Sequence, residues 1–260
     1  MNEFRRPRWI LLSAFVVVFV VASIMLGFWQ LSRLSERRDQ NAIVASRLDR
    51  APVSLEEVVV ALQPVGTVQQ DPADLEFTLV TASGVLQDEG RVLVRSQVVN
   101  GQAGVHAVYP LGLDDGSAVL VNVGWFPLGF DPPPVVDLYP PDSRLDLLGM
   151  VRATQLRPSF GRQEPEGALD QVARIDIGRI QEQVDAPLLG FWIQLLEPHA
   201  DGTLPVPADV PDLDEGAHFS YAIQWFSFAT IAVVGYIALV RKELTRLRRA
   251  ADRSSEPALR

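Results

Sequence analysis

His218, Tyr221 and Trp225 are separated by three and four residues, a spacing that places their side chains on one face of a helix. Trp29 and Arg33 are four residues apart and share a helix face in the same way. An imidazole can ligate haem iron, a guanidinium can pair with a haem propionate, and aromatic rings can pack on a porphyrin. The same residue types also anchor helix ends at membrane surfaces. The spacing therefore leaves two alternatives open: a haem site with His218 as the iron ligand, and a structural anchor.

The rest of the chain offers little support for other chemistry. It has no cysteine, which excludes disulfides, thiolate zinc sites and cysteine nucleophiles. The sequence patterns of metal-dependent and nucleophile-elbow hydrolases are missing, as is a glycine-rich phosphate loop. We expect His106, in a strand-like segment, to be structural, and His199, beside a proline, to be solvated. We therefore expect a protein that is not an enzyme.

Both candidate groups lie at the ends of long apolar segments, which we predict to be transmembrane helices. Residues 9–30 and 222–240 contain no charged side chain. At a rise of 1.5 Å per residue, about 20 residues span the ~30 Å hydrocarbon core of a bilayer. A cleaved signal peptide is the alternative for the first segment. That segment is longer than the usual apolar region of a signal peptide and no A-x-A-like site follows it, which favours a retained anchor.

The uneven distribution of charge predicts an orientation. The net charge is −9, yet residues 1–8 sum to +2 and the basic tail at 241–260 sums to +4. Basic residues beside membrane helices stay in the cytoplasm, so we predict that both termini are cytoplasmic and that residues 31–221 form an extracytoplasmic domain. The arginines that follow residue 30 oppose this orientation, whereas only acidic residues closely precede the second helix. A bacterial plasma membrane is the simplest location, and an acidic exported domain argues against nucleic acid as a partner.

Residues 31–221 have the pattern of a β-rich domain. Segments rich in valine, leucine and threonine alternate with turn residues such as Asn100-Gly101, which predicts about six strands. The expected strands are 77–86, 92–99, 105–111, 118–125, 145–154 and 191–196. Short connections between the first four favour an antiparallel sheet that closes into a small barrel or forms a sandwich. The expected fold class is a membrane protein of α+β type, with two transmembrane helices flanking an antiparallel β-rich extracytoplasmic domain.

Helical segments and a proline-rich loop complete this domain. Residues 31–48 have a helical pattern and are expected to extend the first membrane helix out of the bilayer. Short helices are predicted at 55–62, where Ser54 can cap the first turn, and at 175–184. Residues 127–141 contain six prolines and are expected to form a stiff loop.

Three segments resemble the motifs of a known family. Residues 27–33, with basic Arg37 after them, are similar to the signature G-x-W-Q-x-x-R-x-x-x-(K/R). Residues 119–127 are similar to V-L-V-N-R-G-W-V-P, and residues 218–229 to H-x-x-Y-A-x-x-W-F-x-x-A. With this order and two membrane helices, the chain resembles the Surfeit locus 1 family of cytochrome c oxidase assembly factors. It departs from the family at Val123, where an arginine is usual.

This resemblance implies an assembly factor for the haem-copper cytochrome c oxidase that binds or delivers haem a while the catalytic subunit matures. It implies His218 as the ligand of the haem iron, and we add Tyr221, Trp225, Trp29 and Arg33 as lining residues. The implied partners are oxidase subunits, other assembly factors and the lipid bilayer. The alternative is a haem-free membrane scaffold that stabilises an oxidase intermediate. The sequence does not distinguish the two, and does not identify the subunit contacted or the oligomeric state.

Overall fold

The computed structural model divides the chain into two compact units. Met1–Ile43 and Leu213–Arg260 form one, which we call the helical unit, and Val44–Asp212 form the other, the β unit. The residues described are 7–62, 71–130, 144–156, 158–159, 164–198 and 204–254, the last five without side chains. His199 and most of the proline-rich stretch 127–141 therefore lie outside the described residues.

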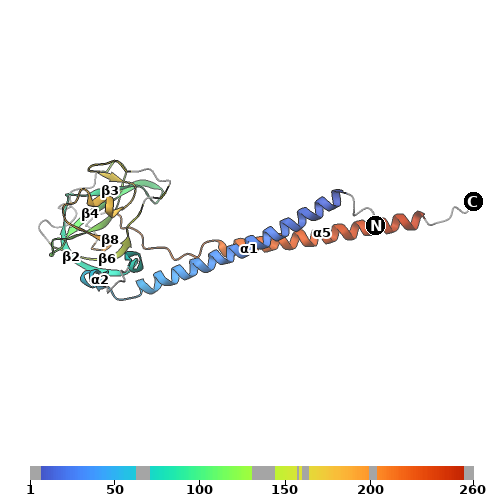
Figure 1. The fold of residues 1–260 in the computed structure, drawn as a ribbon, viewed down its shortest axis with the longest axis horizontal. Helices are drawn as coiled ribbons and strands as arrows, with labels where there is room; N and C mark the ends of the chain where they lie inside the picture. The colour runs from blue at the N-terminus through green and yellow to red at the C-terminus, as the bar shows by residue number, and fades with distance from the viewer. Residues whose placement is uncertain are drawn as a thin grey trace, which may run out of the picture. The chain divides into compact units, whose positions relative to one another are not determined.

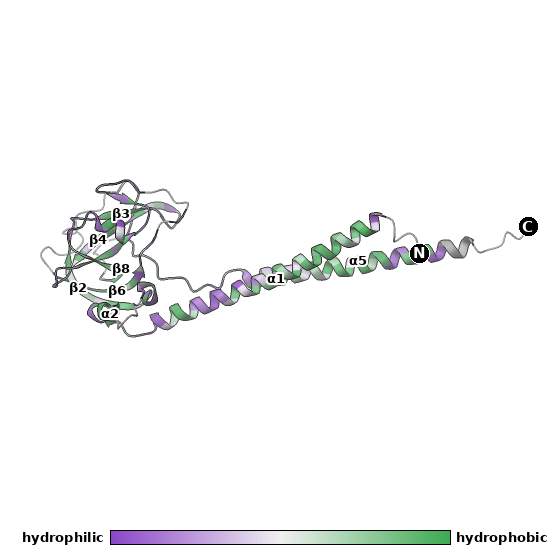
Figure 2. Cartoon of the chain, viewed as in Figure 1, coloured by the Kyte–Doolittle hydropathy of each residue, from purple (hydrophilic) through white to green (hydrophobic). Residues whose placement is uncertain are grey.

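The helical unit contains α5 and all but the last five residues of α1 (Figure 1). α1 covers Pro7–Leu48, 42 residues, and α5 covers His218–Ser254, 37 residues. Both are long and apolar enough to span a membrane. Figure 2 shows apolar residues filling the N-terminal part of α1 and giving way to polar residues toward its C-terminal end. Because α1 is unbroken to Leu48, residues 31–48 are helical and continue the apolar segment.

α1 and α5 pack against each other along a stripe with coiled-coil spacing. Less exposed positions recur every four and three residues along α1, at Trp9, Ser13, Val16, Val20, Ser23, Gly27, Gln30 and Leu34. On α5 they recur at His218, Ala222, Trp225, Ala229, Ala232 and Tyr236. This 3.5-residue period keeps one face of each helix toward its partner. The helices are antiparallel, because Ser13 near the start of α1 meets Tyr236 and Gln30 meets His218.

The β unit holds the remaining elements. They are β1 (Val53–Ser54), α2 (Leu55–Leu62), η2 (Pro72–Leu75), β2 (Leu79–Leu86), β3 (Val92–Val99), β4 (Gln102–Gly112), β5 (Ala118–Pro127), β6 (Leu145–Ala153), β7 (Gln171–Val172), α4 (Ile177–Gln181) and β8 (Leu188–Glu197). The six predicted strands and both predicted short helices are confirmed, with shifted ends. β1 and β7 were not predicted, because two residues are too few to show a period.

The sheet is mixed, so the prediction of an antiparallel sheet was wrong. Its eight strands follow the order β1-β2-β6-β8-β5-β4-β3-β7. β8 lies parallel to β5 and antiparallel to β6. The prediction considered only short connections, whereas more than 60 residues separate the starts of β5 and β8, enough chain for a crossover that returns β8 in the same direction.

A further pairing closes the sheet on itself. β2 pairs with β6 along most of its length and also with β4 at Val85 and Leu86. β2, β6, β8, β5 and β4 therefore form a closed ring, and β3 extends from β4 outside it. One apolar cluster fills the inside of this ring, with Tyr109, Phe191 and Ile193 at its centre. A second covers the outer face of β3, β4, β5 and β8, where residues 172–184 pack on Val108 and Leu120.

The β3–β4 hairpin has the predicted tight turn. Asn100 and Gly101 connect the strands with φ angles of 50° and 77°. Two successive residues with positive φ define a type I′ turn, which favours Asn-Gly and matches the twist of the strands. The turn fixes the register, with Val99 opposite Gln102.

The contact that closes the ring depends on a glycine. A Cβ added at Gly84 would lie 2.5 Å from the carbonyl oxygen of Gly112 and 2.8 Å from Cγ of Leu111. We expect Gly84→Ala to lower the free energy of unfolding by about 1–3 kcal/mol, because neither atom can move without opening the β2–β4 pairing. Thermal unfolding of the full chain in detergent measures the effect. Gly190→Ala in β8 is the matched control, since its Cβ would meet only Pro72 at 3.6 Å. Equal midpoints for the two variants would contradict this account of ring closure.

Candidate functional site

The first residue of α5, His218, is held by α1. Its Nδ1 lies 2.8 Å from Oε1 of Gln30. An amide oxygen only accepts hydrogen bonds, so Nδ1 donates and carries the ring proton. Nε2 then keeps its lone pair. Fixing one imidazole nitrogen with a hydrogen bond, and so presenting the other, is how proteins orient a histidine that ligates a metal.

The edge of the ring that carries Nε2 is bordered by a glycine. A Cβ added at Gly216 would lie 3.5 Å from Cδ2 and 3.7 Å from Nε2 of His218. Gly216 has a φ of 70°, in the left-handed region that favours glycine. The same glycine thus makes the turn before α5 and places no side chain of its own against the Nε2 edge. With Nδ1 bonded to Gln30, Nε2 is the ring nitrogen that could bind a metal.

The loop before α5 is fastened to the polar part of α1. Asn41 donates to the carbonyl oxygen of Leu213 at 2.6 Å, and Arg37 donates to that of Asp214 at 3.3 Å. Arg38 forms a bidentate ion pair with Glu215, with distances of 2.9 and 2.8 Å. We call this set of contacts the loop clamp. It sets where α5 begins, and therefore where His218 lies.

The ion pair of the loop clamp shifts the pKa values of both partners in the expected directions. The hydrogen bond from Arg38 and its positive charge lower the pKa of Glu215. The same hydrogen bond and the charge of Glu215 raise the pKa of Arg38. Both side chains are about half exposed, so solvent screens the pair and its contribution to overall stability is small. Its effect is local, on the position of the loop.

The other predicted site residues are not joined to His218. Within the described part of the chain, His218 hydrogen-bonds to Gln30 alone. Arg33 pairs instead with Glu36 at 2.6 Å, one turn further along α1. Trp29 is 54% exposed and Tyr221 is 51% exposed. The Trp225 ring packs edge-on against Phe228 at 5.8 Å. Lining roles for Trp29, Arg33, Tyr221 and Trp225 stay predictions.

Small residues bring the two helices together next to this site. Gly27 lies directly beneath the ring of Phe226, since an added Cβ would lie 2.6 Å from that ring. Phe226 in turn packs edge-on against Phe28 at 5.4 Å. Ser23 and Ala222 are each only 1% exposed in the same seam. Close approach through small side chains is a common mode of packing between membrane helices.

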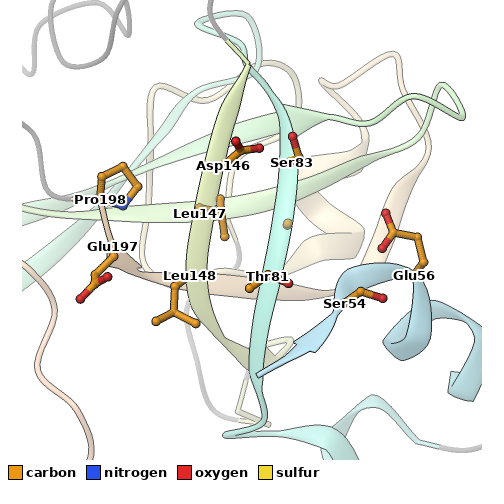
Figure 3. Close-up of a pocket in the computed structure, with 10 residues that line it drawn as sticks. Ser54, Glu56, Thr81, Ser83, Asp146, Leu147, Leu148, Glu197 and Pro198 are labelled. Atoms are coloured by element: carbon orange, nitrogen blue, oxygen red, sulfur yellow. The ribbon is translucent and has the colours of Figure 1, made fainter. Parts of the chain in front are cut away.

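The β unit contains an open groove of about 770 Å³ with three carboxylates (Figure 3). Glu56, Asp146 and Glu197 come from α2, β6 and β8, and all three are exposed to solvent. Thr81 and Ser83 on β2 lie between them.

Val123 has a structural role in this chain. Its side chain is 3% exposed and belongs to the cluster inside the ring of strands. An arginine at this position would place a charge among apolar side chains, or require a different local register of β5. The departure from the motif therefore falls at a core position.

Neither the loop clamp nor the role of Gly216 was predicted from the sequence. The signal was present in two parts, Arg37 and Arg38 after the first apolar segment and acidic Asp214 and Glu215 before the second. These charges served to predict orientation, and Arg37 also belongs to the first family motif. Their opposite signs also predict an ion pair if the two helices are antiparallel and adjacent, which the spacing of small residues in each apolar segment could have suggested.

Comparisons with known proteins agree on one family. The family model described as SURF1 family matches residues 17–230. An uncharacterized SURF1-like protein of Mycobacterium tuberculosis is 30% identical over 260 residues, covering 97% of this chain and 90% of that protein. SURF1-like proteins of Monosiga brevicollis and Rickettsia felis are 25% and 21% identical, covering 90% and 88% of this chain and 87% and 97% of those proteins. The chain belongs to the SURF1 family.

Gly27 generates a prediction about the helix pair. Gly27→Leu should separate α1 from α5 near His218 and lower the free energy of unfolding by about 1–3 kcal/mol, because the added atoms overlap the Phe226 ring. Gly235→Leu is the matched control, since a Cβ there meets nothing within 4 Å. Both changes gain helix propensity, by up to about 1 kcal/mol, so only the clash differs. Thermal unfolding in detergent compares them, and a midpoint for Gly27→Leu at or above that of Gly235→Leu would refute the proposed close approach.

Glu215 generates a prediction about pH. Because its pKa is lowered in the folded protein, the clamp contribution is present above the ordinary glutamate pKa of about 4.3 and is lost as the pH falls through the folded pKa. At neutral pH, Glu215→Gln should therefore speed amide hydrogen exchange at residues 213–217, and the difference from the parent should vanish in acid. Glu36→Gln is the control, because it removes an acid that contacts Arg33 and Ser32 within α1 and lies outside the loop clamp. A difference that persists unchanged in acid would exclude the ion pair as its cause.

Proposed function

We propose that this member of the SURF1 family assists assembly of the haem-copper cytochrome c oxidase by holding haem a at His218 until the catalytic subunit receives it. Family membership supports the general role in oxidase assembly. The observation that carries the haem proposal is the hydrogen bond between His218 and Gln30, which leaves Nε2 as a free electron-pair donor. In this role the haem is cargo, and the protein acts as a chaperone and not as an enzyme.

In this proposal, several residues of the helical unit have a defined role. Gln30 orients the imidazole and keeps it in the tautomer that can ligate iron. The loop clamp holds the first turn of α5 in place. Arg33 and Arg37 supply positive charge along α1, suited to the propionates of a haem, once Arg33 releases Glu36. The exposed Trp29 and Tyr221 would pack on the porphyrin or lie at the membrane surface.

The location follows from the two candidate spans and the distribution of charge. We propose that α1 and α5 cross the plasma membrane with both termini in the cytoplasm, and that the β unit is exported. His218 would then lie at the outer membrane surface. Oxidase subunits and other assembly factors are the proposed partners there.

Two observations favour the haem-free scaffold as a second candidate. Arg33 already has an ionic partner in Glu36, and Trp29 is more than half exposed. These are the features of residues that anchor a helix at a membrane surface. In the scaffold, the His218–Gln30 hydrogen bond would lock the helix pair and bind nothing else.

Haem content of designed variants separates the two candidates. The full chain is purified in detergent after co-expression with haem a biosynthesis, and the reduced-minus-oxidised spectrum is recorded. His218→Ala should lose the a-type signal. Gln30→Leu should lower haem occupancy about 10–100-fold, the usual cost of removing a group that orients a metal ligand. His106→Ala, in the β unit, is the histidine control and should retain the signal.

Each outcome decides whether His218 is the ligand of the haem iron. Haem retained in His218→Ala would overturn the ligand assignment. No a-type signal in the parent chain, together with co-purification of oxidase subunits, would favour the scaffold. Unfolding midpoints measured on the same samples distinguish loss of haem from loss of the helix pair.

A further inference from the structure

We propose that the free edge of β3 at residues 97–99, together with a polar cavity beside it, binds an extended segment of a partner polypeptide that inserts an uncharged, hydrogen-bonding side chain. The edge and the cavity both belong to the β unit. The inference goes beyond the proposed function, since it needs neither haem nor the helical unit.

The edge of β3 is open after a bulge. β7 pairs with β3 only at Leu93 and Val94, and the register of the β3–β4 pair then shifts before Gln97. Ser96 in this bulge has a φ of 64°. No strand in the described ranges pairs with residues 97–99 on the side away from β4. Exposed edges of this kind are the usual template for strand addition by a second polypeptide.

Val98 is the residue that presents its backbone at this edge. In a hairpin with a two-residue turn, Val99 and Gln102 form the first hydrogen-bonded pair. Val98 and Ala103 are then a pair without hydrogen bonds between them, so the N–H and C=O of Val98 point away from β4. The Val98 side chain is 66% exposed, an unusual position for an apolar β-branched residue at a sheet edge. Both features suit pairing with another strand.

A cavity of about 300 Å³ adjoins this edge, at the lower end of the range for ligand pockets. A polar row crosses the sheet beneath it, where the outer apolar cluster ends. Asn122 donates to Nδ1 of His106 at 2.8 Å, and Arg152 donates to Oε1 of Gln194 at 3.1 Å. Asn122 and Gln194 are each only 3% exposed. Buried amides of this kind make the floor of the cavity rigid.

The described lining of the cavity offers both hydrogen-bond donors and hydrogen-bond acceptors. Since Nδ1 of His106 accepts from Asn122, its Nε2 carries a proton and can donate. Gln155 accepts from the N–H of Ile175 through Oε1, which leaves its amide group to donate. Gln97 donates to the carbonyl of Arg95, which leaves its Oε1 to accept. A group that is both donor and acceptor, an amide or a hydroxyl, complements this lining.

The charges around the cavity favour an uncharged occupant. Arg152 is already paired with Glu76 at 3.1 Å and stacks over the rings of Phe77 and Trp192. Burial lowers the pKa of His106, against an opposing effect of Asp209, so the imidazole is neutral at pH 7. Asp209 itself is exposed at the rim. Among the described lining residues, Arg152 is already paired and the carboxylate of Asp209 is screened by solvent, so an uncharged occupant is favoured.

The wall opposite the edge is fixed in place. Trp125 and Val206 exchange two backbone hydrogen bonds of 2.7 and 2.9 Å. Nε2 of Gln194 donates to the carbonyl oxygens of Ala208 and Asp209. Residues 206–209 are therefore held over the sheet by hydrogen bonds within the protein. A wall fixed in this way binds with a smaller cost in conformational entropy.

The test uses a fluorescent peptide, acetyl-Thr-Val-Asn-Val-Thr-amide, with the full chain in detergent. Binding is followed by anisotropy, and amide exchange at residues 97–99 reports edge pairing. We expect the peptide to slow exchange at Val98. Replacing its central asparagine by leucine, aspartate or lysine should weaken binding roughly tenfold, because the polar lining is left unpaired or a charge is buried. A peptide N-methylated on alternate amides, which cannot pair along an edge, should not bind.

Protein variants locate the binding. Val98→Lys should weaken binding by blunting the edge, and Val85→Lys, at another exposed strand valine, is the control. Failure of the asparagine peptide to bind, equal binding of the leucine or N-methylated peptide, or equal effects of the two lysine variants would each overturn the proposal. The a-type spectrum of Val98→Lys should match the parent, so this result and the haem result succeed or fail separately.

Discussion

Close packing of α1 against α5 is the constraint on which the candidate site depends. Ser13 meets Tyr236, Gly27 meets Phe226 and Gln30 meets His218, all in one antiparallel register. A slip of one helical turn, 5.4 Å, would separate the imidazole from the amide that fixes its proton. No single hydrogen bond holds this register. It is set by where small residues allow the backbones to approach, so the chemistry at one end of the helix pair depends on side chains without chemistry in its middle.

In the β unit as well, the candidate binding cavity depends on packing elsewhere in the sheet. Closing the ring through β2 and β4 gives five strands an inside, filled by apolar side chains, and an outside that needs a cover. Residues 172–184 cover only part of it. Where the cover ends, the outward positions change from Val108 and Leu120 to His106 and Asn122, and burial there requires paired polar groups. The polar cavity is thus a consequence of where the apolar layer stops, and the segment at 206–209 lies over it.

The sequence predicted the parts that local patterns determine. Segments rich in valine, leucine and threonine, separated by turn residues, located all six longer strands, and Asn100-Gly101 located the hairpin turn. The parallel pairing of β5 with β8 was missed, because nothing local in Ala118–Pro127 says which distant strand lies beside it. The same limit applies to the site. Helical spacing correctly placed His218 on a face shared with Trp225, but an exposed side chain such as Tyr221 satisfies that spacing equally well. Which residue touches His218 depends on the partner helix.

Two sets of contacts, the Gln30 hydrogen bond and the loop clamp, fix the position of His218. As the first residue of α5 it has no preceding helical turn to hold it, and helix ends fray. Its orientation is therefore set from outside α5, by Gln30 at the ring and by the loop clamp on the backbone before it. Such a residue can be held firmly and still be released, since breaking a few exposed hydrogen bonds frees the loop without unwinding a helix. In the role proposed above, this combination would let His218 hold a haem and later release it.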